Sequence, residues 1–415
     1  MTNEIKQRIE QINRGEVPIG YKTTAVGIVP VEWEERRLED FCTIIGGGTP
    51  ATGNCDFWNG NIPWISSSDI TEKSVNNINI SRFITTSAIQ NSATKICPKG
   101  SILIVSRVGV GKIAISPIEL CTSQDFTNII KSESDKLYLT YLLKKKIIDN
   151  LKYLQGTSIK GITIKEIKSY SMSMPDLKEQ QKIADILSKW DEAVSLQEHL
   201  IKNLEKQKKS LMQKLLSPKE GWKPSKLGDC IKLQNGFAFK SQDFCTEGVA
   251  IVRISNITEK KVDLNNCPHY SGAYINDEFI VKKGDVLIAM SGATTGKIGL
   301  YSYDFISYIN QRVGKFILTN KVFSYEYITQ LLFSTIFENK LKNILITGAQ
   351  PNISSKDIEN IVFVFPNLEE QKKVSKLLAY FDRYTDIQTQ KLNKLKNQQK
   401  AIQQLLLTGI VRVEK

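Results

Sequence analysis

Apolar residues recur at a helical spacing in two long stretches of the chain, and each stretch follows a proline. No proline or glycine occurs between Pro175 and Pro218, or between Pro366 and Gly409. The first stretch has apolar residues at Ile183, Leu187, Trp190, Val194, Ile201, Leu204, Leu211 and Leu215. The second has them at Val374, Leu378, Phe381, Leu392, Leu395, Ile402 and Leu406. Both series follow a seven-residue repeat once polar residues fill their gaps, which predicts two coiled-coil helices.

The polar residues in the two seams fall at equivalent positions. Gln197 corresponds to Gln388, and Lys208 corresponds to Gln399. Polar residues inside a seam weaken it but restrict its register. A helix of about 38 residues would span roughly 57 Å, enough to hold two domains apart. Two seams of the same pattern favour pairing of the helices with each other, although each helix could instead pack only on its own domain. Lysines near the end of the first stretch, from Lys202 to Lys214, form either a solvated face or a contact to DNA or a partner subunit.

The chain also contains an internal duplication at a spacing near 190 residues. The segment 175–183 recurs at 366–374, and 162–167 recurs at 353–358 at the same offset of 191. Further upstream, 99–104 matches 283–288. Trp33, Leu38 and Asp40 are echoed by Trp222, Leu227 and Asp229. So many matches in one order indicate two related halves, each a globular segment followed by a long helix.

Each globular segment alternates short β-rich runs with turn signals and therefore reads as a mixed α+β domain. Strands are predicted at Ile102–Val105, Ile113–Ile115, Val249–Ile254 and Val286–Ala289. Amphipathic stretches at Lys136–Leu154 and Ser324–Leu345 predict helices. The expected division is a helical leader at 1–20, a mixed α+β domain at 21–174, a long helix at 175–217, a second mixed α+β domain at 218–365 and a second long helix at 366–415.

The loops of both segments are rich in residues that can contact base edges and phosphates. In the first half the candidate DNA-binding residues are Ser66, Ser67, Ser68, Asp69, Arg107, Lys112, Thr157, Ser158 and Lys160. In the second half they are Arg253, Ser255, Asn256, Thr294, Thr295, Lys297, Gln350 and Asn352. Ser106 and Ser291 accompany the second loop of each half.

The charge balance also points to a polyanionic partner. The 415 residues include 56 Lys and Arg against 43 Asp and Glu, a formal net charge of +13. A basic surface of this kind favours nucleic acid. The seven cysteines include no CxxC pair, and the two histidines have no neighbouring ligand in sequence, so we expect no metal site. With no secretory signal and no long apolar run, the chain is expected in the cytoplasm, without a membrane contact.

Motifs that would indicate catalysis are incomplete. Val108–Ile113 and Gly292–Ile298 resemble fragments of a phosphate-binding loop, but isoleucine follows each lysine where Ser or Thr would reach magnesium. There is no Pro-Pro dipeptide for the Asp/Asn-Pro-Pro-aromatic motif of DNA amino-methyltransferases. The sequence therefore predicts a chain that is not an enzyme and carries no cofactor of its own.

The order domain, helix, domain, helix resembles the specificity subunits of type I restriction-modification systems. The segment 24–30, followed by Trp33 and Leu38, resembles the usual opening of that family. Proline followed by Glu-Gln and a long helix, at both Pro175 and Pro366, resembles its domain-to-helix junction. Residues 1–20 lie outside the resemblance.

The resemblance implies two target-recognition domains that each read half of a split site in double-stranded DNA. It also implies two long helices that pair antiparallel, set the distance between half-sites and dock two methyltransferase subunits. Nuclease-translocase subunits would complete the restriction complex, with S-adenosylmethionine, ATP and magnesium on the partners. Two alternatives stay open: a specificity subunit with a fused methylase-nuclease partner, and an architectural coiled-coil protein that binds DNA without sequence preference.

Overall fold

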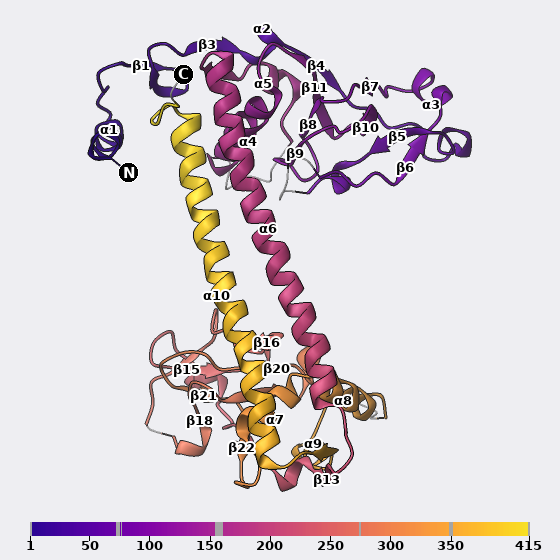
Figure 1. Cartoon of the computed structure of the whole chain (residues 1–415), viewed down its shortest axis with the longest axis vertical. Helices are drawn as coiled ribbons and strands as arrows, with labels where there is room; N and C mark the ends of the chain where they lie inside the picture. The colour runs from indigo at the N-terminus through magenta and orange to yellow at the C-terminus, as the bar shows by residue number, and fades with distance from the viewer. Residues whose placement is uncertain are drawn as a thin grey trace. The chain divides into compact units, whose positions relative to one another are not determined.

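In the computed structural model (Figure 1), the chain forms two units, each of which contains one globular segment of the duplication and parts of both long helices. The structure describes residues 2–413 except 72–74, 76, 154–160, 274 and 348–351. Unit 1 comprises Met1–Gln197 with Lys391–Lys415, and unit 2 comprises Glu198–Gln390. Four of the candidate residues, Thr157, Ser158, Lys160 and Gln350, lie outside the described residues.

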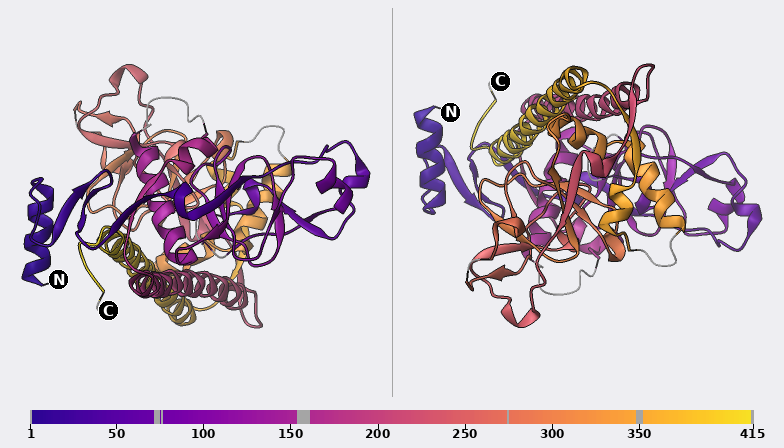
Figure 2. Two further views of the ribbon diagram at one scale, coloured as in Figure 1. Left: turned by 90° about the horizontal axis from the view of Figure 1, so that it is seen from above. Right: turned by 90° about the horizontal axis from the view of Figure 1, so that it is seen from below.

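Unit 1 begins with a leader that has no counterpart in the second half of the duplication. Its helix α1 (Asn3–Asn13) starts at Thr2, whose hydroxyl accepts a hydrogen bond from the amide of Ile5, and no side chain of α1 is buried. The hairpin of β1 (Tyr21–Thr24) and β2 (Gly27–Pro30) follows. Figures 1 and 2 show α1 at the edge of unit 1. The helix of this leader thus occupies only part of residues 1–20.

Two sheets form the centre of unit 1. The first has the order β4 (Cys42–Gly46), β11 (Phe126–Ser132), β8 (Ile102–Val105) and β9 (Ile113–Ile115). The second has the order β6 (Arg82–Ile84), β5 (Ile62–Ile65), β10 (Leu120–Thr122) and β7 (Ile96–Cys97). Within these sheets only the β5–β10 pair is parallel. All four residues of β8 are buried, as expected of a strand covered on both faces.

Unit 2 repeats this arrangement strand for strand. Its first sheet has the order β14 (Ile231–Asn235), β22 (Val313–Leu318), β19 (Val286–Ala289), β20 (Ile298–Leu300) and β16 (Lys260–Lys261). Its second has the order β17 (His269–Tyr270), β15 (Val249–Val252), β21 (Ser307–Ile309) and β18 (Ile280–Val281). The β15–β21 pair is parallel, like β5–β10. The mixed α/β architecture and the duplication are therefore confirmed, and β16 is an addition at one sheet edge.

A third, two-stranded sheet precedes each long helix. In unit 1, β3 (Glu34–Arg37) pairs antiparallel with β12 (Ser171–Met174). In unit 2, β13 (Lys223–Lys226) pairs in the same way with β23 (Val362–Phe365). The remaining short helices are α2 (Leu38–Phe41), α3 (Thr86–Gln90), α5 (Ile164–Lys168) and α9 (Ser355–Glu359).

The predicted amphipathic helices are present, with one difference. Helix α4 (Lys136–Tyr153) is continuous, but the second stretch is divided into α7 (Tyr325–Leu332) and α8 (Thr335–Thr347). The break occurs at Ser334, whose hydroxyl accepts a hydrogen bond from the amide of Phe337 and so caps α8. The predicted strand Val249–Ile254 also ends early, at Val252, because Arg253 begins a capped turn.

The two long helices are α6 (Leu177–Leu216) and α10 (Leu368–Leu407). In unit 1, Ile183 and Leu187 near the start of α6 share a core with Leu406 and Leu407 at the end of α10. Unit 2 has the opposite combination, with Met212 and Leu216 at the end of α6 and Val374 and Leu378 at the start of α10. The helices therefore run antiparallel (Figures 1 and 2).

Helix α10 ends before the predicted limit of residue 415. Gly409 adopts a positive φ of 70°, and the amide of Val411 donates to the carbonyl of Leu405. A left-handed glycine just past the last turn is a common way to end a helix. The chain then leaves the helix axis, and the guanidinium of Arg412 forms an ion pair with Glu179 at 2.7 Å.

Each long helix is tied to its domain by a buried glutamine. The side-chain oxygen of Gln180 accepts from the hydroxyl of Ser134 at 2.7 Å and from the amide of Asp135 at 2.9 Å, while its nitrogen donates to the carbonyl of Pro175 at 2.9 Å. Gln371 repeats this arrangement, accepting from the amide of Ser324 and donating to the carbonyl of Pro366. The Pro-x-x-x-Glu-Gln repeat thus encodes a structural joint.

Replacing Gln180 with alanine should lower the free energy of unfolding by about 1–3 kcal/mol, because it leaves buried hydrogen-bonding groups unpaired. Urea-induced unfolding measures the effect. The adjacent Gln181 is exposed, so Gln181→Ala is the matched control and should change stability by no more than about 0.5 kcal/mol. Equal losses in the two variants would contradict the proposed joint.

Candidate nucleic-acid interface and helix seam

A short turn joins the two sheets of each unit, and the two turns are built alike. Residues Ser123–Asp125 connect β10 to β11, and residues Asn310–Arg312 connect β21 to β22. The amide of Ser123 donates to the carbonyl of Ile65 at 2.8 Å, and that of Asn310 donates to the carbonyl of Val252 at 2.9 Å. We call these two segments the crossover turns.

A glycine packs against each crossover turn. A Cβ on Gly47 would lie 2.1 Å from the carbonyl oxygen of Ser123, and one on Gly236 would lie 2.2 Å from that of Ile309. These separations are far inside van der Waals contact with backbone atoms, so neither position accepts a side chain. The amide of Gly47 donates to Phe126, and that of Gly236 donates to Val313, both at 3.1 Å.

The first group of candidate loops lies beside the crossover turns and is shaped by its own side chains. Asp69 accepts a hydrogen bond from the amide of Ser66 at 2.7 Å, and Asn256 accepts one from the amide of Arg253 at 3.0 Å. Asp69 also pairs with Arg82. Because Asp69 and Asn256 are buried, their side chains stabilise the loop rather than face a ligand, whereas Ser68 and Ser255 are exposed. Ser67 is buried and Ser66 is half-buried.

The second group of loops closes over the first. The ammonium group of Lys112 donates to the carbonyl of Ser67 at 3.1 Å, and the hydroxyl of Thr294 donates to the carbonyl of Ile254 at 3.0 Å. Different side chains thus make the same loop-to-loop contact in the two units. Arg107 and Lys297 are exposed, and Thr295, whose hydroxyl donates to the carbonyl of Gly292, is half-buried. Ser106 and Ser291 are buried.

A third loop in each unit contacts the second group of loops, next to the crossover turn. The amide of Ile162 donates to the carbonyl of Ser106 at 2.7 Å, and that of Ile353 donates to the carbonyl of Met290 at 3.0 Å. Ser106 and Met290 in turn donate to the carbonyls of Asp125 and Arg312 in the crossover turns. Asn352 is exposed beside this contact. The described candidate residues of each half therefore gather around one crossover turn.

Sequence reasoning missed the crossover turns themselves. Gln124, Gln311 and Arg312 are exposed at these turns and were not among the candidate residues. The segments Ser-Gln-Asp-Phe at 123–126 and Asn-Gln-Arg-Val at 310–313 share one glutamine at an offset of 187. That match could have identified them, but a single shared residue is a weak signal without the fold.

The chemistry of these loop clusters suits binding rather than catalysis. They present hydroxyl and amide groups together with the basic side chains of Arg107, Lys297 and Arg312. Burial raises the pKa of Cys97 to about 12 and that of Cys121 to about 11, which keeps these thiols protonated and poorly nucleophilic at neutral pH. Across the described ranges, no group of three or more His, Cys, Asp or Glu residues could hold a metal ion.

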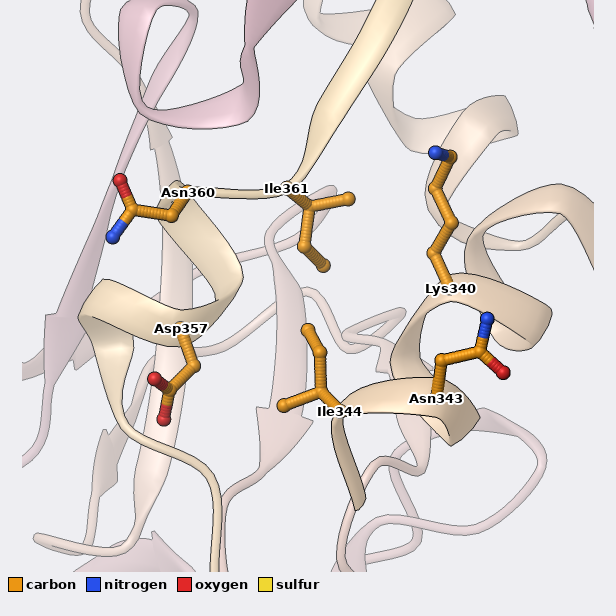
Figure 3. A pocket seen from close by; sticks show the side chains of 6 residues that line it. All are labelled: Lys340, Asn343, Ile344, Asp357, Asn360 and Ile361. Carbon is orange, nitrogen blue, oxygen red and sulfur yellow. The ribbon is translucent and has the colours of Figure 1, made fainter. Parts of the chain in front are cut away.

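One pocket lies apart from the crossover turns, between α8 and α9 in unit 2. Figure 3 shows Ile344 facing Ile361, with Asp357 and Lys340 on opposite sides. Its volume is about 370 Å³, and Asn343 and Asn360 complete its lining. Asp357 is occupied as the cap of α9, where hydrogen bonds from the side chain and amide of Ser354 lower the pKa of Asp357. The pocket brings no catalytic group together.

The seam positions of both helices face inward at every predicted site. In α6, Ile183, Leu187, Gln197 and Leu204 are buried, while Trp190, Val194, Ile201, Lys208, Leu211 and Leu215 are half-buried. In α10, Val374, Leu378 and Leu406 are buried, while Phe381, Thr385, Gln388, Leu392, Leu395, Gln399 and Ile402 are half-buried. Most residues between these positions are exposed, so the seven-residue pattern corresponds to one continuous stripe.

Two of the polar seam positions join each helix to the other. In unit 1, the side chain of Gln399 on α10 donates to Asp191 on α6, and Asp191 also accepts from the hydroxyl of Tyr141 on α4. In unit 2, Lys208 on α6 forms an ion pair with Asp382 on α10, which also accepts from Gln330 on α7. Each aspartate thus connects both long helices with a helix of the adjoining domain. We call these the aspartate clamps.

Comparison with known proteins agrees with this architecture. The family model of the type I restriction modification DNA specificity domain matches residues 30–206 and again residues 219–397. The MjaVIII specificity subunit of Methanocaldococcus jannaschii is 28% identical over 413 residues, covering 93% of this chain and 94% of that protein.

Solved structures show the same fold. A chain from a study of complex assembly and conformational transition in the type I R-M system has a TM-score of 0.60 at 16% identity, covering 92% of this chain and 99% of that one. The crystal structure of a type I S subunit from M. genitalium has a TM-score of 0.56 at 17% identity, covering 92% and 97%. No helix among the described residues is long and apolar enough to cross a membrane.

Two long helices and two copies of one mixed α/β domain define the architecture, and the family model matches each copy. The two matched segments together cover most of the chain, so it belongs to the family of type I restriction-modification DNA specificity subunits. Specificity subunits are the non-catalytic DNA-recognition components of these systems. The resemblance inferred from Pro175, Pro366 and the opening segment is confirmed.

The aspartate clamp of unit 1 predicts a pH effect. Burial raises the pKa of Asp191 above its ordinary value of about 3.9, against the opposing effect of the Tyr141 hydrogen bond. The folded chain therefore holds this proton more tightly than the unfolded chain. The stability contributed by Asp191 is complete below the unfolded pKa and is lost as the pH rises through the folded pKa.

Asp191→Asn cannot ionise and escapes this loss. Relative to wild type, the variant should become more stable as the pH rises from about 4 to neutrality, so its free energy of unfolding should increase against that of wild type. Urea unfolding at several pH values measures the trend. Asp185→Asn, on the exposed face of the same helix, is the control and should show little change. A difference that does not vary with pH would contradict the role of burial.

Proposed function

We propose that each unit reads one half of a bipartite site in double-stranded DNA, and that α6 and α10 set the spacing between the half-sites. The observation that carries this proposal is the duplicated loop cluster. Each crossover turn is surrounded by equivalent loops, while side chains at equivalent positions differ between units, for example Asp125 in unit 1 and Arg312 in unit 2. Shared geometry with different side chains supports recognition of two different half-sites.

The same helices would dock two methyltransferase subunits. Apolar side chains remain exposed on the face of α10 away from the seam, including Leu377, Tyr380 and Ile387. Exposed apolar groups along a helix favour contact with another protein. Nuclease-translocase subunits would join the full complex, and S-adenosylmethionine, ATP and magnesium would be bound by these partners rather than by this chain.

Exchange of one domain tests the modular reading. Replacing residues 21–174 with the matching domain of a relative should change one half-site of the methylated sequence and leave the other half-site and the spacer unchanged. Mapping of methylated positions in genomic DNA, in cells that carry the partner subunits, measures the outcome. Simultaneous change of both half-sites would refute independent reading, and methylation without the specificity subunit would refute its role.

Insertion of whole heptads tests the helices as a spacer. Adding seven residues after Leu204 and seven after Leu395 preserves the seam because the repeat is seven. Each helix grows by roughly 10 Å, so the spacer should lengthen by one to about three base pairs with both half-sites unchanged. Methylation mapping measures the spacer.

The control for this experiment is an insertion of two residues at the same positions. It rotates the remainder of each helix by about 200° and removes Leu211 and Leu215 from the seam, so assembly should be lost. An active heptad variant with an unchanged spacer would show that the helices do not measure the site.

A further inference from the structure

Gln124 and Gln311 hold equivalent positions at the centre of the two crossover turns. Each is exposed and directly follows a residue whose amide is bonded to a buried parallel strand, Ser123 to Ile65 of β5 and Asn310 to Val252 of β15. Within the described part of the chain, neither glutamine amide group has a hydrogen-bond partner. Both side chains therefore present an unused donor and an unused acceptor to solvent.

The backbone beneath each glutamine is fixed from several directions. The amide of Phe126 closes the first turn onto Ser123 at 3.1 Å, and the amide of Val313 closes the second onto Asn310 at 2.8 Å. Phe126 and Val313 are buried. The backbone of Gly47 or Gly236 packs so closely against each turn that no side chain would fit between them. Because this backbone is already ordered, binding through the side chain costs no further loop-ordering entropy, which distinguishes it from a glutamine on a loose surface loop.

The residues around the glutamines differ while the glutamine recurs. Ser123 is replaced by Asn310, and Asp125 by Arg312, a reversal of charge. A site that merely attracted phosphates would favour a positive charge at both turns. The shared feature is instead one neutral amide, whose donor and acceptor together match the edge of an adenine in the major groove.

We infer that Gln124 and Gln311 are direct-readout residues, each of which recognises one adenine in the half-site of its own unit. A glutamine amide can accept from the N6 amino group of adenine and donate to its N7 in the major groove. This assignment rests on the proposed function, since it requires that each unit faces one half-site. It adds a residue and a base type to each of them.

The experiment uses the complete complex with its partner subunits and the site identified by methylation mapping. Binding is measured for wild type, Gln124→Ala and Gln311→Ala on DNA substituted at each position of the site in turn. Gln124→Ala should reduce discrimination at one adenine of the first half-site by roughly 5- to 150-fold and leave the second half-site unaffected. Gln311→Ala should do the reverse, so each variant is the control for the other.

Two further variants separate readout from structure. Gln124→Glu replaces the amide with an acceptor-only group, which suits the amino group of cytosine, so preference at that position should move from adenine towards cytosine. Gln90→Ala, exposed at the end of α3, should change nothing. A uniform loss of affinity at every position, or unchanged discrimination at all adenines, would overturn the inference while leaving the bipartite proposal intact. A wild-type complex that recognises no split site would refute the proposed function itself.

Discussion

Antiparallel burial of the α6 and α10 seams is the constraint on which the rest of the structure depends. Neither helix has a stable apolar face alone in water, because seam residues such as Leu187 and Leu378 require a covering surface. Each unit provides that surface from the opposite helix and from its own domain, so domain core and helix seam merge in one cluster. The buried glutamines Gln180 and Gln371 and the aspartate clamps then fix the direction in which each domain leaves its helix.

The two units share one backbone arrangement, but they differ in the side chains that make equivalent contacts. The contact made by Lys112 in unit 1 is made by Thr294 in unit 2, and the cap provided by Asp69 is provided by Asn256. In each pair the hydrogen-bonding capacity is kept while charge or size changes. Because main-chain geometry carries the loops, their exposed positions are free to vary without loss of the fold.

The sequence predicted what depends on periodicity and missed what depends on long-range pairing. The heptads of Ile183–Leu215 and Val374–Leu406 fix helix type and seam face, because side-chain direction along a helix follows from spacing alone. The interruption at Ser334 and the crossover turns depend on pairing between distant strands, such as β5 with β10, which no local pattern encodes. For the same reason the sequence placed Asp69 and Asn256 among the candidate DNA-binding loop residues, although the fold buries both side chains.

Unit 1 is discontinuous in the chain, and this has a consequence for synthesis. Its core includes Leu406 and Leu407, and Arg412 pairs with the buried Glu179, so its last stabilising contacts arrive only with residues that are translated after the whole of unit 2. Unit 2 is contiguous from Glu198 to Gln390 and has all its residues earlier. Although domains usually fold in order from the N-terminus, here unit 2 can complete its core first, because unit 1 still lacks Leu406, Leu407 and Arg412 when the last residue of unit 2 has been translated.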